Sequence, residues 1–429
     1  MKKFFFLLLL SSTGSQINAQ TLSEQEQQLV TYINNEIPNN LVLLKKLVDI
    51  NSGTLNIAGV KKVGNILGKE FTKIGFTTEW IKLPDSLKRA GHLVAYKKGK
   101  KGKKVFLIGH LDTVFELDMP GNPYRKINDS TVTGQGVEDM KGGDVIILAA
   151  LNALEHFGLL KDVTITAYFT GDEEKGGNPR SVARADFIKR ATTHDIALGF
   201  EGAKGLNTVV TGRRGVSSWK LNVLGKQSHS AGIFGDSAGY GSVFETARIL
   251  DSFRTGLSAE KYLSFNPGII AGGTEIREIP GGMETVGKDN IIASTTIVDG
   301  DLRFLTETQK DTARAKMKRI VGANNLPGTS AEISFSDGIP SMEPTLGNSK
   351  LVAIISKVGI DMGIGEIKED DPGSRGAGDI SYVAKYLDCM DGLGASGKGA
   401  HAPGETMNLN QFPVLISRAA ILIYRLTRE

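Results

Sequence analysis

The chain has 429 residues, of which 40% are hydrophobic and 23% are charged, and its formal net charge is +4. This is the composition of an ordinary globular protein, and it excludes both a disordered chain and a bundle of membrane helices. A chain of this length predicts two cores, because single hydrophobic cores rarely grow beyond roughly 250–300 residues.

The first 19 residues have the pattern of a bacterial secretory signal peptide. Two lysines precede the apolar run 4–10, and small and polar residues then lead to Ala19. The apolar run is much shorter than the ~20 residues that a membrane-spanning helix needs. We therefore predict cleavage after Ala19, export to the periplasm or the cell exterior, and no membrane span in the mature chain. An uncleaved anchor is the alternative. Removal of the two lysines lowers the net charge to +2.

Helices and short apolar strands alternate over the first half of the mature chain. Helical spacing of apolar residues predicts helices over 25–47, bent or interrupted near Pro38, and over 60–74. Apolar runs predict strands at 105–108, 163–169 and 196–200, with a helix over 143–154. This alternation predicts an α/β fold whose mostly parallel sheet has helices on both faces.

Six lysines alternate with glycines between residues 97 and 104. A patch that binds phosphate or lipid is one interpretation of this run. Lysine and glycine between two apolar runs are more typical of a solvated hairpin turn. We therefore expect no nucleic-acid partner.

The pattern changes at about Arg213. Residues 216–223 and 290–304 alternate as antiparallel strands do, while 242–250 and 308–320 have helical spacing. We predict that 213–339 form a smaller α+β lid or dimerisation domain. This domain is inserted into a catalytic domain made of residues 20–212 and 340–429. Helices predicted at 350–362, 379–386 and 413–424 complete the larger domain.

Acidic and imidazole side chains follow the predicted strands or glycine turns in four clusters, and a fifth cluster lies late in the chain. They are 109–112 with His110 and Asp112, 136–139 with Asp139, 171–174 with Glu173 and Glu174, 199–201 with Glu201, and 401–405 with His401. Each cluster alone has a plain explanation, such as a helix N-cap or a solvated turn. In an open α/β sheet, however, ligands bind beyond the carboxyl ends of the strands, so we expect the clusters to meet.

About five carboxylates in one pocket would repel one another unless cations neutralised them. Carboxylates and imidazoles without a thiolate favour zinc, with cobalt or manganese as substitutes, over calcium. Two such ions ~3.5–4 Å apart can share one water, lower its pKa and polarise a carbonyl. The sequence thus predicts amide hydrolysis without a covalent intermediate.

In this order, the clusters resemble those of the zinc-dependent M20 peptidases, and most closely the glutamate carboxypeptidase branch of a family that also includes aminoacylases and dipeptidases. The resemblance covers essentially the whole mature chain. It implies that Glu173 is the general base and that Asp112 fixes the orientation of the His110 ring. It implies a cis peptide bond at Asp139–Met140. The implied ligands of two zinc ions, with Asp139 bridging them, are His110, Asp139, Glu174, Glu201 and His401. Some members carry Asp at the position of Glu201.

The resemblance also implies substrate-binding residues. His229, in segment 225–232, would stabilise the oxyanion, and in related dimers this histidine serves the other subunit. Asn290 and Arg303 would grip a substrate carboxylate, while Gly376 would line the pocket. A local pair between Asp301 and Arg303 is the alternative.

The sequence therefore predicts an exported two-zinc carboxypeptidase that releases a C-terminal residue, such as glutamate, from a small peptide. A homodimer through the smaller domain is expected. An N-acyl amino acid hydrolase or a dipeptidase with the same metals is the alternative. A binding protein that has lost catalysis would lack a ligand or the base, and none is missing from this sequence.

Overall fold

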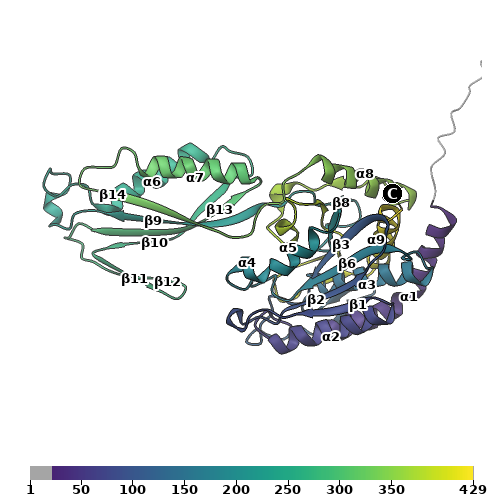
Figure 1. Ribbon diagram of the computed structural model, residues 1–429. Coiled ribbons are helices and arrows are strands. Elements are labelled where there is room, and N and C mark those ends of the chain that lie inside the picture. The colour runs from purple at the N-terminus through teal and green to yellow at the C-terminus, as the bar shows by residue number, and fades with distance from the viewer. Residues whose placement is uncertain (1–21, 429) are drawn as a thin grey trace, which may run out of the picture.

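The computed structural model describes residues 22–428, so the predicted signal peptide lies outside the described residues. Two units are visible in Figure 1: a larger one that contains both ends of the described chain, and an elongated smaller one joined to it by a narrow connection. Among residues 22–428, no helix combines the length and apolar character needed to cross a membrane.

A six-stranded sheet forms the centre of the larger unit, in the order β1-β2-β6-β3-β7-β16. The strands β6, β3, β7 and β16 are parallel, whereas β2 runs antiparallel to both of its neighbours, β1 and β6. This confirms the mostly parallel sheet. The strands are β1 (Thr77–Ile81), β2 (His92–Lys97), β3 (Lys101–His110), β6 (Val163–Thr170), β7 (Ile196–Gly199) and β16 (Asp388–Met390).

Both faces of this sheet are covered. In β3, Val105 and Leu107 belong to one core while Phe106 and Ile108 belong to a second core, as expected for side chains that alternate along a strand. The first core contains residues of α1 (Glu24–Val48), α2 (Ile57–Lys73), α3 (Lys141–His156), α8 (Leu346–Asp361) and α9 (Phe412–Leu426). The second contains residues of α5 (Ala185–Ala191), which follows α4 (Arg180–Ala183), and of the 3-10 turn η4 (Asp379–Tyr382).

The remaining elements of the larger unit are short. One small sheet has the order β17-β18-β5-β4, and a second pairs β15 with β8. Their bounds are β4 (Arg125–Asn128), β5 (Thr131–Thr133), β8 (Thr208–Val209), β15 (Lys368–Glu369), β17 (Gly397–Lys398) and β18 (Thr406–Asn408), with 3-10 turns η1 (Asp85–Leu87) and η3 (Pro372–Ser374).

The smaller unit has its own four-stranded antiparallel sheet, in the order β10-β13-β9-β14, and its own core. All buried residues of that core lie between Trp219 and Ile333. Two helices contribute to this core, and a hairpin extends from the sheet edge. The elements are β9 (Gly215–Leu224), η2 (Ser230–Gly232), α6 (Gly241–Leu257), β10 (Ser264–Gly273), β11 (Glu275–Ile279), β12 (Gly282–Val286), β13 (Thr295–Phe304), α7 (Glu307–Val321) and β14 (Ser330–Asp337).

Three local predictions need correction. The predicted interruption near Pro38 is wrong, because α1 continues through this residue. Pro38 is exposed, so water can bond the backbone carbonyl that the missing N–H of the proline leaves without a partner in the helix. The hairpin at 97–104 is also wrong, since β6 lies between β2 and β3 and the connection crosses its start, with Lys100 N donating to Asp162 O. The helix predicted at 379–386 is only the short turn η4.

Candidate metal centre

The carboxyl ends of three neighbouring parallel strands carry the predicted ligands. His110 is the last residue of β3, Glu174 follows β6, and Glu201 follows β7. Asp139 lies just before α3, and His401 lies in the connection between β17 and β18. The structure thus brings together all five residues that the sequence proposed as metal ligands, and they form two groups that share Asp139.

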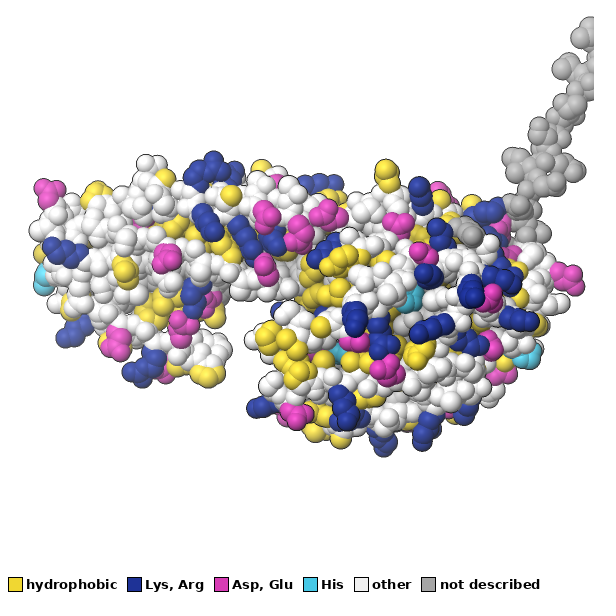
Figure 2. Space-filling model, in the orientation of Figure 1, with side chains coloured by type: hydrophobic (Ala, Val, Ile, Leu, Met, Phe, Trp, Pro, Cys, Tyr) yellow, Lys and Arg dark blue, Asp and Glu magenta, His cyan; other side chains and the backbone are white. Residues whose placement is uncertain are grey.

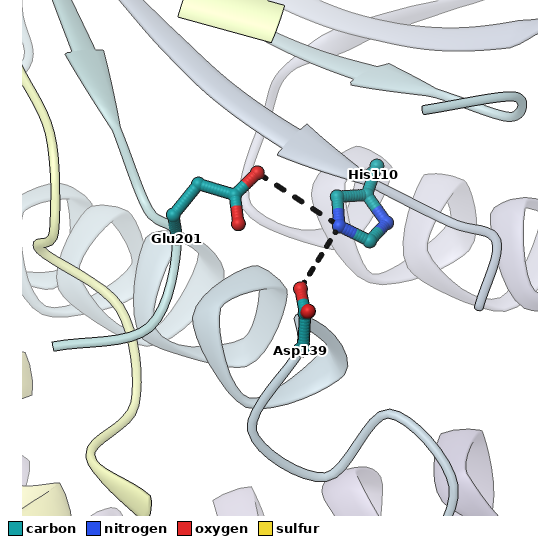
Figure 3. Close-up of side chains that lie close together, drawn as sticks. All are labelled: His110, Asp139 and Glu201. Carbon is teal, nitrogen blue, oxygen red and sulfur yellow. Dashed lines mark hydrogen bonds and ion pairs between the residues drawn. The ribbon is translucent and has the colours of Figure 1, made fainter. Parts of the chain in front are cut away.

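The first group consists of His110, Asp139 and Glu201, whose side chains converge in Figure 3. The Nε2 atom of His110 lies 3.3 Å from Asp139 Oδ1 and 3.9 Å from Glu201 Oε1. Two donor atoms that each lie about 2.1 Å from one zinc ion are at most about 4.2 Å apart. Both distances therefore suit ligands of a single ion.

The second group consists of Asp139, Glu174 and His401. The Nε2 atom of His401 lies 3.0 Å from Asp139 Oδ2 and 3.3 Å from Glu174 Oε2. Asp139 therefore presents one carboxylate oxygen to each imidazole, which is the arrangement of a carboxylate between two ions. The Asp139–Met140 peptide bond is cis, which confirms the prediction for this bond.

Asp112 is fully buried and links the first imidazole to the loop after β6. The Nδ1 atom of His110 lies 3.0 Å from the backbone carbonyl of Asp112 and 3.6 Å from its carboxylate. This carboxylate accepts hydrogen bonds from the Thr54 hydroxyl at 2.6 Å and from the backbone N–H groups of Glu173 and Glu174 at 3.1 Å each. Asp112 thereby sets the position of two acidic residues as well as that of the ring.

Glu405, which sequence reasoning left without a role, holds the loop that carries Asp139. Its buried carboxylate accepts hydrogen bonds from the backbone N–H groups of Gly136, Glu138 and Asp139 at 2.7–2.8 Å. Burial raises the pKa of Glu405 to about 7, although the three N–H donors act to lower it. The position of Glu405 in the segment that begins at His401 was the available signal.

We predict that Glu405→Gln weakens zinc binding about tenfold to a hundredfold, the usual cost of losing a partner that orients a ligand. A glutamine has one acceptor oxygen and would turn an N–H donor toward the backbone donors of this loop. Calorimetric titration with Zn²⁺ measures the effect, and Glu366→Gln, at an exposed side chain paired with Lys368, is the matched control. Equal affinities in the two variants would contradict the role of Glu405.

The site has an excess of negative charge that a cation would relieve. Burial, reinforced by the charge of Asp139, raises the pKa of Glu174 to about 8 and that of Glu201 to about 7. Burial and then the charge of Glu201 raise the pKa of Glu173 well above its ordinary value. The buried Oε1 atom of Glu174 has no hydrogen-bond partner within residues 22–428. Unpaired buried acids of this kind fit divalent cations held by carboxylate and imidazole donors.

The structure does not bring His229 and Asn290 to this centre. Arg213 lies beside Asp391, which accepts a hydrogen bond from the backbone N–H of Glu201. From there β9 leads away from the metal centre for ten residues, or roughly 30 Å. His229 follows the far end of β9 and is close to Asn290, whose carbonyl accepts from the backbone N–H of residue 230. Both residues therefore lie at the remote end of the smaller unit.

Arg303 lies at the end of the smaller unit that is nearer to the larger unit, and Gly376 lies in the larger unit itself. Arg303 is at the near end of β13, opposite Val216, and its Nε atom donates to Asp301 at 2.9 Å. The backbone carbonyl of Gly376 accepts a hydrogen bond from Arg213 at 3.1 Å. The side chain of Arg303 pairs with Asp301 and contacts neither of the two ligand groups.

The other three histidines lie outside both groups. His92 is buried between the carbonyl of Ala183 and the N–H of Gly171, and His194 contacts Thr166. His156 stacks on a tyrosine ring. These contacts give the three histidines structural roles.

The α/β fold and the clustered carboxylates and imidazoles are typical of a metal-dependent hydrolase. The sequence signature of peptidase family M20/M25/M40 matches residues 106–425, and the chain belongs to this family. It is similar to carboxypeptidase G2 of Pseudomonas sp. (strain RS-16), with 27% identity over 396 residues, which cover 90% of this chain and 89% of that protein.

Solved structures share the fold at low identity. Aminopeptidase PepT from Bacillus cereus superposes with a TM-score of 0.72 and 17% identity, covering 94% of this chain and 98% of that chain. The M20 family metallo-carboxypeptidase Sso-CP2 from Sulfolobus solfataricus has a TM-score of 0.63 and 17% identity, covering 90% of this chain and 99% of that chain. The YXEP protein of Bacillus subtilis, described as a dinuclear metal binding peptidase, has a TM-score of 0.64 and 13% identity, covering 92% of this chain and 99% of that chain.

Proposed function

We propose that this chain is a two-zinc carboxypeptidase that hydrolyses the amide bond before a C-terminal residue, such as glutamate, of a small peptide. The observation that carries the proposal is the Asp139 carboxylate, with one oxygen facing each imidazole of two ligand groups. Similarity to carboxypeptidase G2 over nine-tenths of both chains supports the reaction class.

The donor set suits zinc, and cobalt or manganese can replace it at sites of nitrogen and oxygen ligands. One ion would be held by His110, Asp139 and Glu201, and the other by Asp139, Glu174 and His401. Such a pair of ions supplies a water of lowered pKa and polarises the carbonyl of the scissile amide.

Glu173 is the proposed proton carrier of this reaction. Its backbone N–H is fixed on the carboxylate of Asp112, and burial raises the pKa of its own carboxyl group well above the ordinary value, which favours a residue that accepts a proton and later releases it. In the proposed mechanism Glu173 takes a proton from the attacking water and passes it to the departing amine. Asp112 keeps the ring of His110 in its binding orientation.

The smaller unit would complete the site as a lid, and in a dimer. Figure 2 shows a wide hollow between the two units, on one side of their connection. His229 is too remote to reach the metal ligands of its own chain in this arrangement, which supports action in the site of a second copy. Exposed apolar side chains near edge strand β10 support a dimer interface there. They are Phe234, Val243, Phe244 and Ile270.

We predict that mixing two inactive variants, His229→Ala and Glu173→Gln, restores activity. In a mixed dimer one site receives both an intact base and an intact histidine, so the heterodimer should reach about half the native rate if the sites are independent. The measurement is kcat of heterodimers purified with two different affinity tags. Each variant alone is the control, and no rescue in a verified heterodimer would place the action of His229 within its own chain.

An N-acyl amino acid hydrolase or a dipeptidase is the second candidate. Its substrates carry the same C-terminal carboxylate, so Arg303, which pairs with Asp301, would serve either reaction. Comparing kcat/KM for peptides ending in glutamate, neutral dipeptides and N-acyl amino acids distinguishes the two. A preference for N-acyl amino acids or neutral dipeptides would contradict the carboxypeptidase proposal.

We also propose that the chain is exported after cleavage behind Ala19, on the pattern of residues 1–19. Sequencing the N-terminus of the mature protein tests this. A mature chain that begins at Met1 would contradict it.

A further inference from the structure

Arg213 lies in the joint between the two units. The chain passes from the larger unit to the smaller one just after this residue and returns near Met342. The backbone groups of the two residues are paired, since Arg213 N donates to Met342 O at 2.9 Å and Met342 N donates to Arg213 O at 3.0 Å. The position of this backbone is therefore tied to the start of the smaller unit.

The side chain of Arg213 points back into the larger unit, where it forms a buried ion pair. Its Nε atom lies 2.7 Å from Asp391 Oδ2, and the two side chains are 6% and 0% exposed. The other oxygen of Asp391 accepts from the backbone N–H groups of Glu201, at 3.3 Å, and of Gly392, at 2.7 Å. Asp391 thus connects Arg213 to the backbone of a proposed metal ligand.

A second side of the guanidinium holds the segment 376–378. Its Nη1 atom donates to the carbonyls of Gly376 at 3.1 Å and Ala377 at 3.4 Å. A Cβ atom on Gly378 would come within 2.9 Å of Nη1, so the segment is packed directly against the guanidinium. Gly378 is therefore a position where even one methyl group would displace Arg213.

The same segment is fastened at its other end to the loop of the proposed base. Asp379 accepts from Arg184 Nε at 2.8 Å, and the Arg184 Nη2 atom donates to the carbonyl of Asp172, just before Glu173. Two buried arginines thus hold 376–379 between the loops that carry Glu201 and Glu173.

A buried ion pair is weak evidence for stabilisation, because desolvation of the two charges offsets their attraction. A planar guanidinium with several fixed donors, however, can bind a carboxylate and two carbonyls at once, which a lysine cannot do. The contacts of Arg213 therefore favour a role in geometry over a role in net stability.

We propose that Arg213 is a positioning residue that couples the joint of the smaller unit to the backbone of Glu201, through Asp391, and to the carbonyls of segment 376–378. The proposal rests on the proposed function in so far as Glu201 is a metal ligand. It assigns Arg213 no contact with substrate.

Three variants of the full chain test this role. Arg213→Lys keeps a charge opposite Asp391 but loses the fork of donors. Because Arg213→Met alone would leave Asp391 buried without a partner, which is strongly destabilising, that change is combined with Asp391→Asn. The neighbouring Arg214→Met removes a guanidinium whose Nη1 bonds to Ser264 in the smaller unit, and it is the matched control.

Two readouts are compared, namely Zn²⁺ titration of the chelated protein by calorimetry and hydrogen exchange of the backbone amides at 199–202 and 376–379. Arg213→Lys and the double variant should remain folded. We expect each to bind one Zn²⁺ at least tenfold more weakly and to exchange both segments at least tenfold faster than the native chain. Arg214→Met should match the native chain in both.

Native values of either readout in Arg213→Lys would overturn the proposal, and so would equal effects in Arg214→Met. Failure of the native chain to bind Zn²⁺ would contradict the proposed function instead. In that case the exchange of the two segments would by itself decide the role of Arg213.

Discussion

Glu173→Gln is expected to lower kcat by about 10²–10⁴, the contribution typical of a positioned general base, while zinc binding stays at the native level. Glu173 belongs to neither ligand group, and its backbone N–H would still donate to Asp112 in the variant. The amide of glutamine cannot take a proton from water, so the loss should fall on the chemical step and leave KM nearly unchanged.

The adjacent acid provides a sharp control for this variant. Glu174→Gln alters a side chain whose Oε2 atom lies 3.3 Å from His401 Nε2 within a ligand group. It should lose affinity for one ion, whereas Glu173→Gln should not. Steady-state kinetics with metal analysis of both purified variants makes the comparison. A native rate in Glu173→Gln would remove the proton-transfer role, and loss of metal in that variant would make Glu173 a ligand.

The arrangement of the centre could be predicted because it depends on short-range patterns. Apolar runs located β3, β6 and β7, and polar residues directly after a parallel strand share one edge of the sheet. His110, Glu174 and Glu201 therefore meet for a reason that is visible in the sequence. Asp391 follows β16 in the same way, but it was missed because no strand was predicted at 388–390.

Other features depend on contacts that no local pattern contains. The residues between β2 and β3 resemble a hairpin turn, yet β6, more than 50 residues later in the chain, inserts between the two strands. Hydrogen bonds from backbone N–H groups of the loop at 136–139 to the carboxylate of Glu405 join segments over 260 residues apart. The remote place of His229 follows from the direction in which β9 leaves the joint, and the direction of a strand cannot be read from its residues.

Removal of the metal ions is expected to abolish activity and to lower Tm by roughly 10 °C. An ion present at 1,000 times its Kd stabilises the folded state by about 4 kcal/mol. One kcal/mol corresponds to about 2–4 °C for a domain of about 150–250 residues, and the lower end of this range applies to the larger unit of this chain. Dialysis against a chelator, followed by thermal unfolding with and without added Zn²⁺, provides the measurement. Full activity after exhaustive chelation would contradict a metal mechanism.

The loss of stability on chelation should grow with pH. Without an ion, the folded-state pKa values of Glu174 and Glu201 are about 8 and about 7, both above the unfolded value of about 4.3. At pH values between the unfolded and folded pKa values, the folded chain binds more protons than the unfolded chain. The stability of the chelated protein therefore falls as pH rises from about 4.5 to about 8. His401, whose pKa its bond to Asp139 raises to about 9, adds stability that is complete below about 6.5 and is lost toward pH 9, so it acts in the same direction.

Bound ions reverse this dependence, because the carboxylates must be ionised and the imidazoles neutral to serve as ligands. The difference in Tm between the zinc-loaded and chelated protein should therefore be larger at about pH 8 than at about pH 5.5. Glu174→Gln, with one ligand group incomplete, should show a smaller difference at both values. A difference in Tm that is constant across this range would mean that the acids of the two groups keep ordinary pKa values in the chelated chain, and the electrostatic case for a cation site would fail with it.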